Sequence, residues 1–143
     1  MERHWKSSAM GAHASADKFI SAARWHEFSI EPPLRVALRR FDANSFDEGD
    51  FIRFGVHEPP DLARAVLRRK AEYLAGRITA RAELRRFGLG DTQIGTGTMR
   101  APVWPESIVG SISHSIDHVA AVVADRRDFA SLGLDVEPLM PLE

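Results

Sequence analysis

The chain has 143 residues, 44% of them hydrophobic, which is enough for one domain with a buried core. Its 19 basic and 20 acidic side chains leave a net charge of -1, so no overall charge favours nucleic acid or an anionic membrane as a partner. There is no cysteine, which excludes disulfides, thiolate metal sites and thiol catalysis. The longest aliphatic run, residues 119–124, is far shorter than the roughly 20 residues of a membrane span, and the amino end has no apolar signal segment. We therefore expect a soluble, cytoplasmic protein.

The first third of the chain predicts a leader followed by a strand and a loop. Residues 1–33 are rich in Ala, Ser and His without a clean period, so they predict a leader that is either mobile or an irregular helix around residues 19–25. The segment "LRVALRRF" (34–41) alternates as a strand does, and "DANSFDEGDF" (42–51) has the composition of a loop. The folded domain is therefore expected to begin at residue 34.

Residues 57–90 carry the clearest secondary-structure signal. The segment opens on prolines and closes on glycines, and it predicts one long helix between them. Apolar residues at the helical period form one stripe: Leu67, Ala71, Leu74, Ala75, Ile78 and Ala82.

The rest of the chain predicts short extended elements. "DTQIGTGTM" reads as a loop or short strand, and "RAPVWPES" must be extended because its prolines forbid a helix. "VGSISHS" and "HVAAVVAD" predict strands around a turn, and "SLGLDVE" predicts a final strand. A strand, a long helix and then several strands indicate an α+β or mixed α/β fold.

Two carboxylates, Asp135 and Glu137, lie on the expected final strand. Side chains on a strand alternate between faces, so both acids point the same way with their Cα atoms about 7 Å apart. Such a pair can bind a hard cation such as Mg²⁺, which needs few protein carboxylates. The alternative is a strand with one solvent-facing side, and the pair by itself does not decide between them.

The expected helix is strongly basic. Between residues 61 and 86 the basic side chains are Arg64, Arg68, Arg69, Lys70, Arg77, Arg81, Arg85 and Arg86, against Asp61, Glu72 and Glu83. Lys70, Arg77 and Arg81 fall close together around the helix, and such a cluster can bind phosphate. The alternative is a solvated face with Glu72 as the local partner.

A third candidate feature is the run "GSISHS", in which His114 stands among serines. Ser113 and His114 point to opposite faces of a regular strand, so a nucleophilic Ser-His dyad is disfavoured. Ser111, Ser113 and Ser115 share one face. His114 could donate to a phosphate, or it could be a satisfied core histidine.

The order of these segments resembles a known family. "RRKAEYLAGRITARAEL", "RAPVWPESIVGSISHS" and "LGLDVEP" follow one another as in 4′-phosphopantetheinyl transferases of the Sfp type, and most resemble the enterobactin-synthase branch. That branch combines R-x-x-E-[FY]-L-A-G-R, P-x-W-P, G-S-[IL]-[ST]-H and G-[IL]-D-x-E. The resemblance runs from about residue 34 to the last residue and does not cover residues 1–33.

The resemblance implies a fold and an activity. Family members have two pseudo-symmetric halves, so residues 34–143 are expected to be the amino-terminal half, with the long helix packed on a small, mostly antiparallel sheet. These enzymes transfer the phosphopantetheine arm of coenzyme A (CoA) to a serine of an acyl, peptidyl or aryl carrier protein, with Mg²⁺ bridging the pyrophosphate. They serve siderophore or other secondary-metabolite biosynthesis. The carrier serine is the nucleophile, so the enzyme needs none of its own.

The resemblance also implies the roles of particular residues. For CoA it indicates Arg69 and Arg77 at the phosphates or nucleotide, Arg100 near the adenine and 3′-phosphate, and Ser113 and His114 at the phosphates. For Mg²⁺ it indicates Asp135 and Glu137.

The sequence departs from the family pattern in two places. The loop "GTGTM" before Arg100 lacks the basic residues of many relatives. The W-x-x-K-E-[AS] helix of the second half has no counterpart, since no lysine is followed by Glu and no tryptophan follows Trp104. No complete catalytic set is therefore expected.

Two hypotheses remain open. The chain is either an enzyme whose site is completed by a missing carboxy-terminal half or by a homodimer, or a truncated chain that only binds CoA or the carrier protein. A nucleic-acid binder is disfavoured, because Glu72 and Glu83 interrupt the basic patch and no nucleic-acid-binding module is recognisable.

Overall fold

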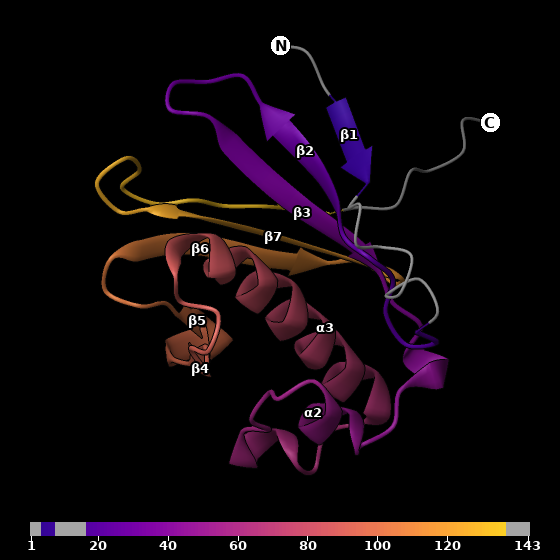
Figure 1. Ribbon diagram of the computed structural model, residues 1–143. Helices are drawn as coiled ribbons and strands as arrows, with labels where there is room; N and C mark the ends of the chain where they lie inside the picture. Colours follow the sequence, from indigo (N-terminus) through magenta and orange to yellow (C-terminus); the bar gives the residue numbers. More distant parts are fainter. Residues whose placement is uncertain (1–3, 8–16, 137–143) are drawn as a thin grey trace, which may run out of the picture.

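A computed structural model describes residues 4–7 and 17–136 of the chain. Within these residues one five-stranded sheet, in the order β1-β2-β3-β7-β6, carries the fold, and every neighbouring pair of strands is antiparallel (Figure 1). The strands are β1 (His4–Ser7), β2 (Arg24–Phe28), β3 (Leu34–Arg40), β4 (Gly95–Thr96), β5 (Pro102–Val103), β6 (Ile108–His114) and β7 (His118–Asp125), with β4 and β5 forming a separate hairpin. The helical elements are η1 (Ala43–Ser45), α2 (Asp50–Arg53), η2 (Pro60–Leu62), α3 (Leu67–Leu84), η3 (Arg85–Phe87) and η4 (Thr98–Arg100). In the described part of the chain, no helix is long and apolar enough to cross a bilayer.

The long helix α3 lies across one face of the sheet (Figure 1). It begins after Val66, whose backbone is extended, and it ends through η3 at Gly88, whose φ of 73° is the left-handed conformation that glycine favours at helix ends. The helix predicted within residues 57–90 is confirmed, although the prolines form the separate turn η2. The expected α+β class, with a long helix packed on an antiparallel sheet, is also confirmed.

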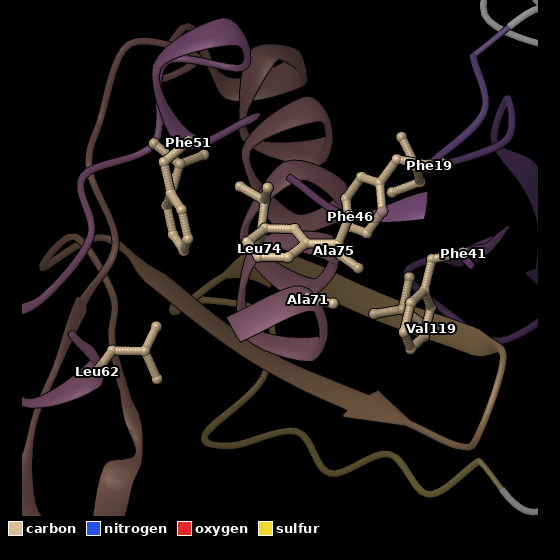
Figure 2. Packing of buried hydrophobic residues seen from close by; sticks show 11 residues of the cluster. Phe19, Phe41, Phe46, Phe51, Leu62, Ala71, Leu74, Ala75 and Val119 are labelled. Carbon is tan, nitrogen blue, oxygen red and sulfur yellow. The ribbon is translucent and has the colours of Figure 1, made fainter. Parts of the chain in front are cut away.

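Aromatic side chains fill the space around the middle of α3. Figure 2 shows Phe19, Phe46 and Phe51 close to Leu74 and Ala75 of the helix. The rings of Phe19 and Phe46 lie 5.7 Å apart, within the usual range of aromatic pairs. This packing fixes α3 against the sheet, and thereby fixes the direction of its polar side chains.

The predicted apolar stripe of α3 is fully buried only in its middle, and Ile78 and Ala82 are partly buried. Ala71, Leu74 and Ala75 are fully buried, whereas Leu67 is 56% exposed. Leu67 is the first residue of the helix, and its side chain remains largely in solvent.

Residues 17–33 differ from the expected leader. No irregular helix occurs around residues 19–25, because Arg24–Phe28 forms β2 and pairs with β3. Phe19 and Ile20 are buried, and Ile20 bridges to Phe41. The prediction missed this region because its strand is only five residues long and is flanked by an Ala-, Ser- and His-rich sequence.

Residues 131–136 run across the face of the sheet opposite α3. Leu132, Leu134 and Val136 pack against a cluster formed by β3 and β7. Asp135, between two of them, is exposed, so the predicted alternation of faces is present. The predicted final strand is nevertheless wrong, because this extended segment has no strand assignment and its hydrogen bonds go to serine side chains.

Candidate functional site

Two glycines, Gly76 and Gly110, allow α3, β6 and the segment around Trp104 to pack closely. A Cβ on Gly76 of α3 would lie 2.8 Å from Cγ2 of Ile112 on β6, and a Cβ on Gly110 would lie 2.7 Å from the ring of Trp104. Both distances are too short for ordinary contact, so a larger residue at either position would push the elements apart. The segments "LAGR", "PVWP" and "GSISH" are therefore packed directly on one another.

His114 lies at the end of β6, where the strand reaches the first turns of α3. Its Nδ1 is 3.3 Å from a carboxylate oxygen of Glu72, and its side chain is 44% exposed. Arg68 contacts the same carboxylate at 4.0 Å and donates a hydrogen bond to the carbonyl of Ile116. His114 is thus not a buried core histidine, which removes one of the two alternatives left open by the sequence.

Arg77 ties α3 to the β4-β5 hairpin. Its Nε donates to the carbonyl of Ile94, and its Nη2 donates to the carbonyl of Gly95 and the hydroxyl of Thr96, at 3.0–3.2 Å. Its guanidinium stacks 4.3 Å from the ring centre of Tyr73. Burial lowers the pKa of Arg77, with a smaller opposing contribution from Tyr73. The bonds that Arg77 makes hold the hairpin in place.

Arg100 lies in the loop of that hairpin. Met99 and Arg100 have φ values of 55° and 63°, which non-glycine residues rarely adopt. Met99 is 95% exposed and Arg100 is exposed as well. Within residues 4–7 and 17–136, the side chain of Arg100 makes no hydrogen bond or ion pair, so its guanidinium is available to an anion.

Arg69 occupies the helix surface between His114 and the hairpin. It precedes Glu72 by three residues and Tyr73 by four, so it neighbours both on the helix. Glu72 holds His114, while the Tyr73 hydroxyl is 3.5 Å from that of Thr96 in the hairpin. Arg69 is half-buried, and the described residues give its side chain no hydrogen-bonding or ionic partner.

The predicted phosphate-binding cluster of Lys70, Arg77 and Arg81 does not form. Lys70 is buried and contacts Glu48, with Glu58 at 3.6 Å, and these partners raise the pKa of the Lys70 ammonium. Arg81 donates to backbone carbonyls, including that of Gly55 at 2.6 Å. The prediction is wrong for Lys70 and Arg81 because these cations bind the loops that cross the helix.

Ser113 lies on the opposite face of β6 from His114, as predicted. Its Oγ accepts a hydrogen bond from the backbone N–H of Val136 at 3.1 Å. Ser111 Oγ accepts from the N–H of Leu134 at the same distance. The Ser113 side chain therefore points toward the segment that carries Asp135, whereas the His114 side chain points toward α3.

The expected metal ligands are only partly described. Asp135 is exposed, and its carboxylate makes no ion pair within residues 4–7 and 17–136. Glu137 lies outside the described residues. Over the described ranges, no group of three or more His, Asp or Glu side chains is arranged to hold a metal ion.

Two contacts in this region were not predicted from the sequence. Tyr73 stacks on Arg77, and Glu72 pairs with His114. The four-residue spacing of Tyr73 and Arg77 indicates a contact on a helix, whereas the pairing of Glu72 with a residue 42 positions later leaves no local signal.

The structure is thus an α+β domain that presents two arginines without ionic partners in the described residues, Arg69 and Arg100, and a half-exposed His114, which are side chains suited to an anionic ligand. Residues 57–124 match the family described as the 4′-phosphopantetheinyl transferase N-terminal domain. These residues form an amino-terminal domain of the 4′-phosphopantetheinyl transferase family. The matched region contains Arg69, Arg77, Arg100, Ser113 and His114, whereas Asp135 and Glu137 follow it.

Three curated proteins are similar to this chain over part of their length. The chain is 41% identical over 106 residues to enterobactin synthase component D of Salmonella austin, a match that covers 74% of this chain and 42% of the relative. It is 44% identical over 85 residues to the 4′-phosphopantetheinyl transferase Svp of Streptomyces mobaraensis, covering 59% and 35% of the two chains. It is 37% identical over 81 residues to PptT of Mycobacterium tuberculosis, covering 57% and 36%. The chain thus matches less than half the length of these relatives.

Proposed function

We propose that this chain is the amino-terminal part of an enzyme that transfers the 4′-phosphopantetheine arm of CoA to a serine of an acyl, peptidyl or aryl carrier protein. The observation that carries the proposal is the family match over residues 57–124, which includes five candidate CoA-binding residues. The similarity to enterobactin synthase component D supports a role in siderophore or related secondary metabolism. We propose that this role is exercised in the cytoplasm.

The CoA phosphates are proposed to bind at the end of α3 nearest His114. Arg69 and Arg100 are cations without carboxylate partners in the described residues, and a guanidinium binds phosphate through charge-assisted hydrogen bonds. His114 supplies a half-exposed ring that contacts Glu72, which follows Arg69 by three residues on the helix. Arg77 contributes by holding the hairpin that carries Arg100.

The residues of the carboxyl-terminal segment fit Mg²⁺. Mg²⁺ prefers oxygen ligands and is usually held by one or two carboxylates, substrate phosphates and water. Asp135 offers an exposed carboxylate without an ionic partner among the described residues, and we propose it as a ligand together with Glu137. When bound, Mg²⁺ would neutralise the negative charge that develops on the pyrophosphate as the leaving group departs.

The transfer needs positioning and charge stabilisation from this chain. The carrier serine Oγ bonds to the phosphorus that bears pantetheine, while the bond from this phosphorus to the bridging oxygen breaks and 3′,5′-ADP leaves. Arg69, Arg100 and His114 would hold the phosphates during this displacement. We assign no base for the serine proton within the described residues.

A binding-only role is the second candidate function. This role requires only the cations Arg69 and Arg100 and the half-exposed ring of His114, which the described residues supply. In this role the chain would retain CoA or carrier protein without turnover, whereas a second half or a homodimer would restore a complete site.

A direct assay separates the two candidates. The purified chain is mixed with an apo carrier protein, CoA and Mg²⁺, and the carrier is weighed by mass spectrometry. The transferase proposal expects the added mass of phosphopantetheine, lost when EDTA replaces Mg²⁺. If no product forms at high enzyme concentration, the isolated chain is not a transferase. CoA should then still raise the melting temperature under the binding-only proposal, and Arg69→Ala should reduce that shift.

A further inference from the structure

Two serine hydroxyls hold the segment that carries Asp135. Ser111 and Ser113 are two residues apart on one face of β6, and their Oγ atoms accept hydrogen bonds from the N–H groups of Leu134 and Val136, both at 3.1 Å. The two serines and the two amides that they bind are therefore both spaced by two residues. This pairing replaces the backbone ladder of a strand with a ladder of side-chain acceptors.

Apolar packing alone would not fix the register of this segment. Leu132, Leu134 and Val136 face the same apolar cluster, so a slip by two residues would leave apolar side chains on the sheet. Such a slip would move Asp135 by about 7 Å along the sheet. In the observed register Ser111 accepts from the Leu134 amide and Ser113 from the Val136 amide, and both hydrogen bonds must break before the segment can slip.

We propose that Ser111 and Ser113 are positioning residues that fix where Asp135 stands relative to β6. The role of Asp135 as a metal ligand rests on the proposed function. The hydrogen bonds from the Leu134 and Val136 amides to the serines do not depend on that function. A serine hydroxyl that accepts from an amide keeps its own O–H to donate. Ser113 is thus able to hold Val136 and to donate to an anion bound beside the segment, which would join the carboxylate and phosphate parts of the site.

Amide hydrogen exchange, measured by NMR on the whole chain, tests the register directly. Ser111→Ala should lower the protection of the Leu134 amide, and Ser113→Ala that of the Val136 amide, each by about fivefold or more, since each loses one hydrogen bond. The matched control is Ser115→Ala, because this serine makes no side-chain hydrogen bond within residues 17–136.

The pattern of exchange distinguishes positioning from general stability. Ser111→Thr and Ser113→Thr keep the hydroxyl and should restore protection. If the alanine variants leave the Leu134 and Val136 amides unchanged, or speed exchange equally throughout β6, the positioning role is overturned.

Mn²⁺, used alone as a paramagnetic probe, tests the consequence for Asp135. In the wild-type chain Mn²⁺ should broaden the amide signals around Asp135, and Ser113→Ala should require about fivefold more Mn²⁺ for the same broadening. If the exchange pattern is found but wild type and variant respond equally to Mn²⁺, the serines do not position a metal ligand. If wild type shows no Mn²⁺ response, the metal part of the proposed function fails, while the exchange result still decides the role of the serines.

Discussion

Replacement of Glu83 should destabilise the fold more than replacement of any surface acid. Glu83 lies in the last turn of α3, is 1% exposed, and accepts hydrogen bonds at 3.1 Å from Trp25 Nε1 and from Nε and Nη2 of Arg35. Burial lowers the pKa of nearby Arg39, and attraction to Glu83 partly offsets this. Glu83 is therefore the counter-charge for two arginines between the helix and the sheet.

The size of the effect follows from these contacts. Removing one partner of a buried ion pair costs about 3–5 kcal/mol. The side chain of Arg35 keeps 26% exposure, so we expect the lower end, about 3 kcal/mol, for Glu83→Ala. Glu83→Gln keeps an acceptor for Trp25 and loses only the charge, so about 2 kcal/mol is expected.

Urea unfolding at neutral pH, followed by tryptophan fluorescence, measures these losses. The slope with denaturant should stay constant while the midpoint falls. Arg127→Ala is the control, because its side chain is 88% exposed and its only ion pair in the described residues is local. A loss below about 1 kcal/mol for Glu83→Ala, or equal losses for Ala and Gln, would refute the assigned role of this carboxylate.

Two further predictions concern packing and acid stability. Gly76→Ala should cost about 1–3 kcal/mol, because its Cβ would lie 2.8 Å from Ile112, whereas Gly95→Ala enters open space and should leave the melting temperature nearly unchanged. Equal effects at the two glycines would contradict the close approach of α3 to β6. The Arg53 hydrogen bond lowers the pKa of Asp17 below its ordinary value of 3.8, so Asp17 stabilises the fold above that pH and this contribution is lost as the pH falls through the lowered pKa. The stability difference between wild type and Asp17→Asn should therefore be constant near neutral pH and shrink in acid; a difference that grows in acid would contradict this sign.

The sequence predicted correctly the features that depend on the spacing of neighbouring residues. The helix followed from apolar spacing around Leu74, and the opposite facing of Ser113 and His114 followed from strand alternation. It could not tell that Lys70 and Arg81 would bind crossing loops, because their partners are distant in sequence or are backbone carbonyls. A basic residue on a helix has the same local sequence pattern whether it binds a phosphate or a loop of its own chain.

The carboxyl-terminal segment shows a different limit of sequence reasoning. Alternation placed Asp135 correctly on the exposed side, yet a strand was predicted where the backbone bonds to serine hydroxyls. Strand propensity describes a pleated, half-buried segment and does not specify which acceptors the amides find. The serines of "GSISHS" were noted as sharing a face, but their partners emerge only in three dimensions.

The most direct test of the account is to map CoA binding on the whole chain by NMR in the presence of Mg²⁺. We predict saturable changes at the first turns of α3, the end of β6 and the β4-β5 hairpin. Arg69→Ala and Arg100→Ala should each weaken binding about tenfold or more, the value of a charge-assisted hydrogen bond, while exposed Arg24→Ala on β2 should not. No saturable change at millimolar CoA, or changes centred instead on the pocket of about 450 Å³ lined by Asp17, Arg40 and Asp117, would contradict the proposed site.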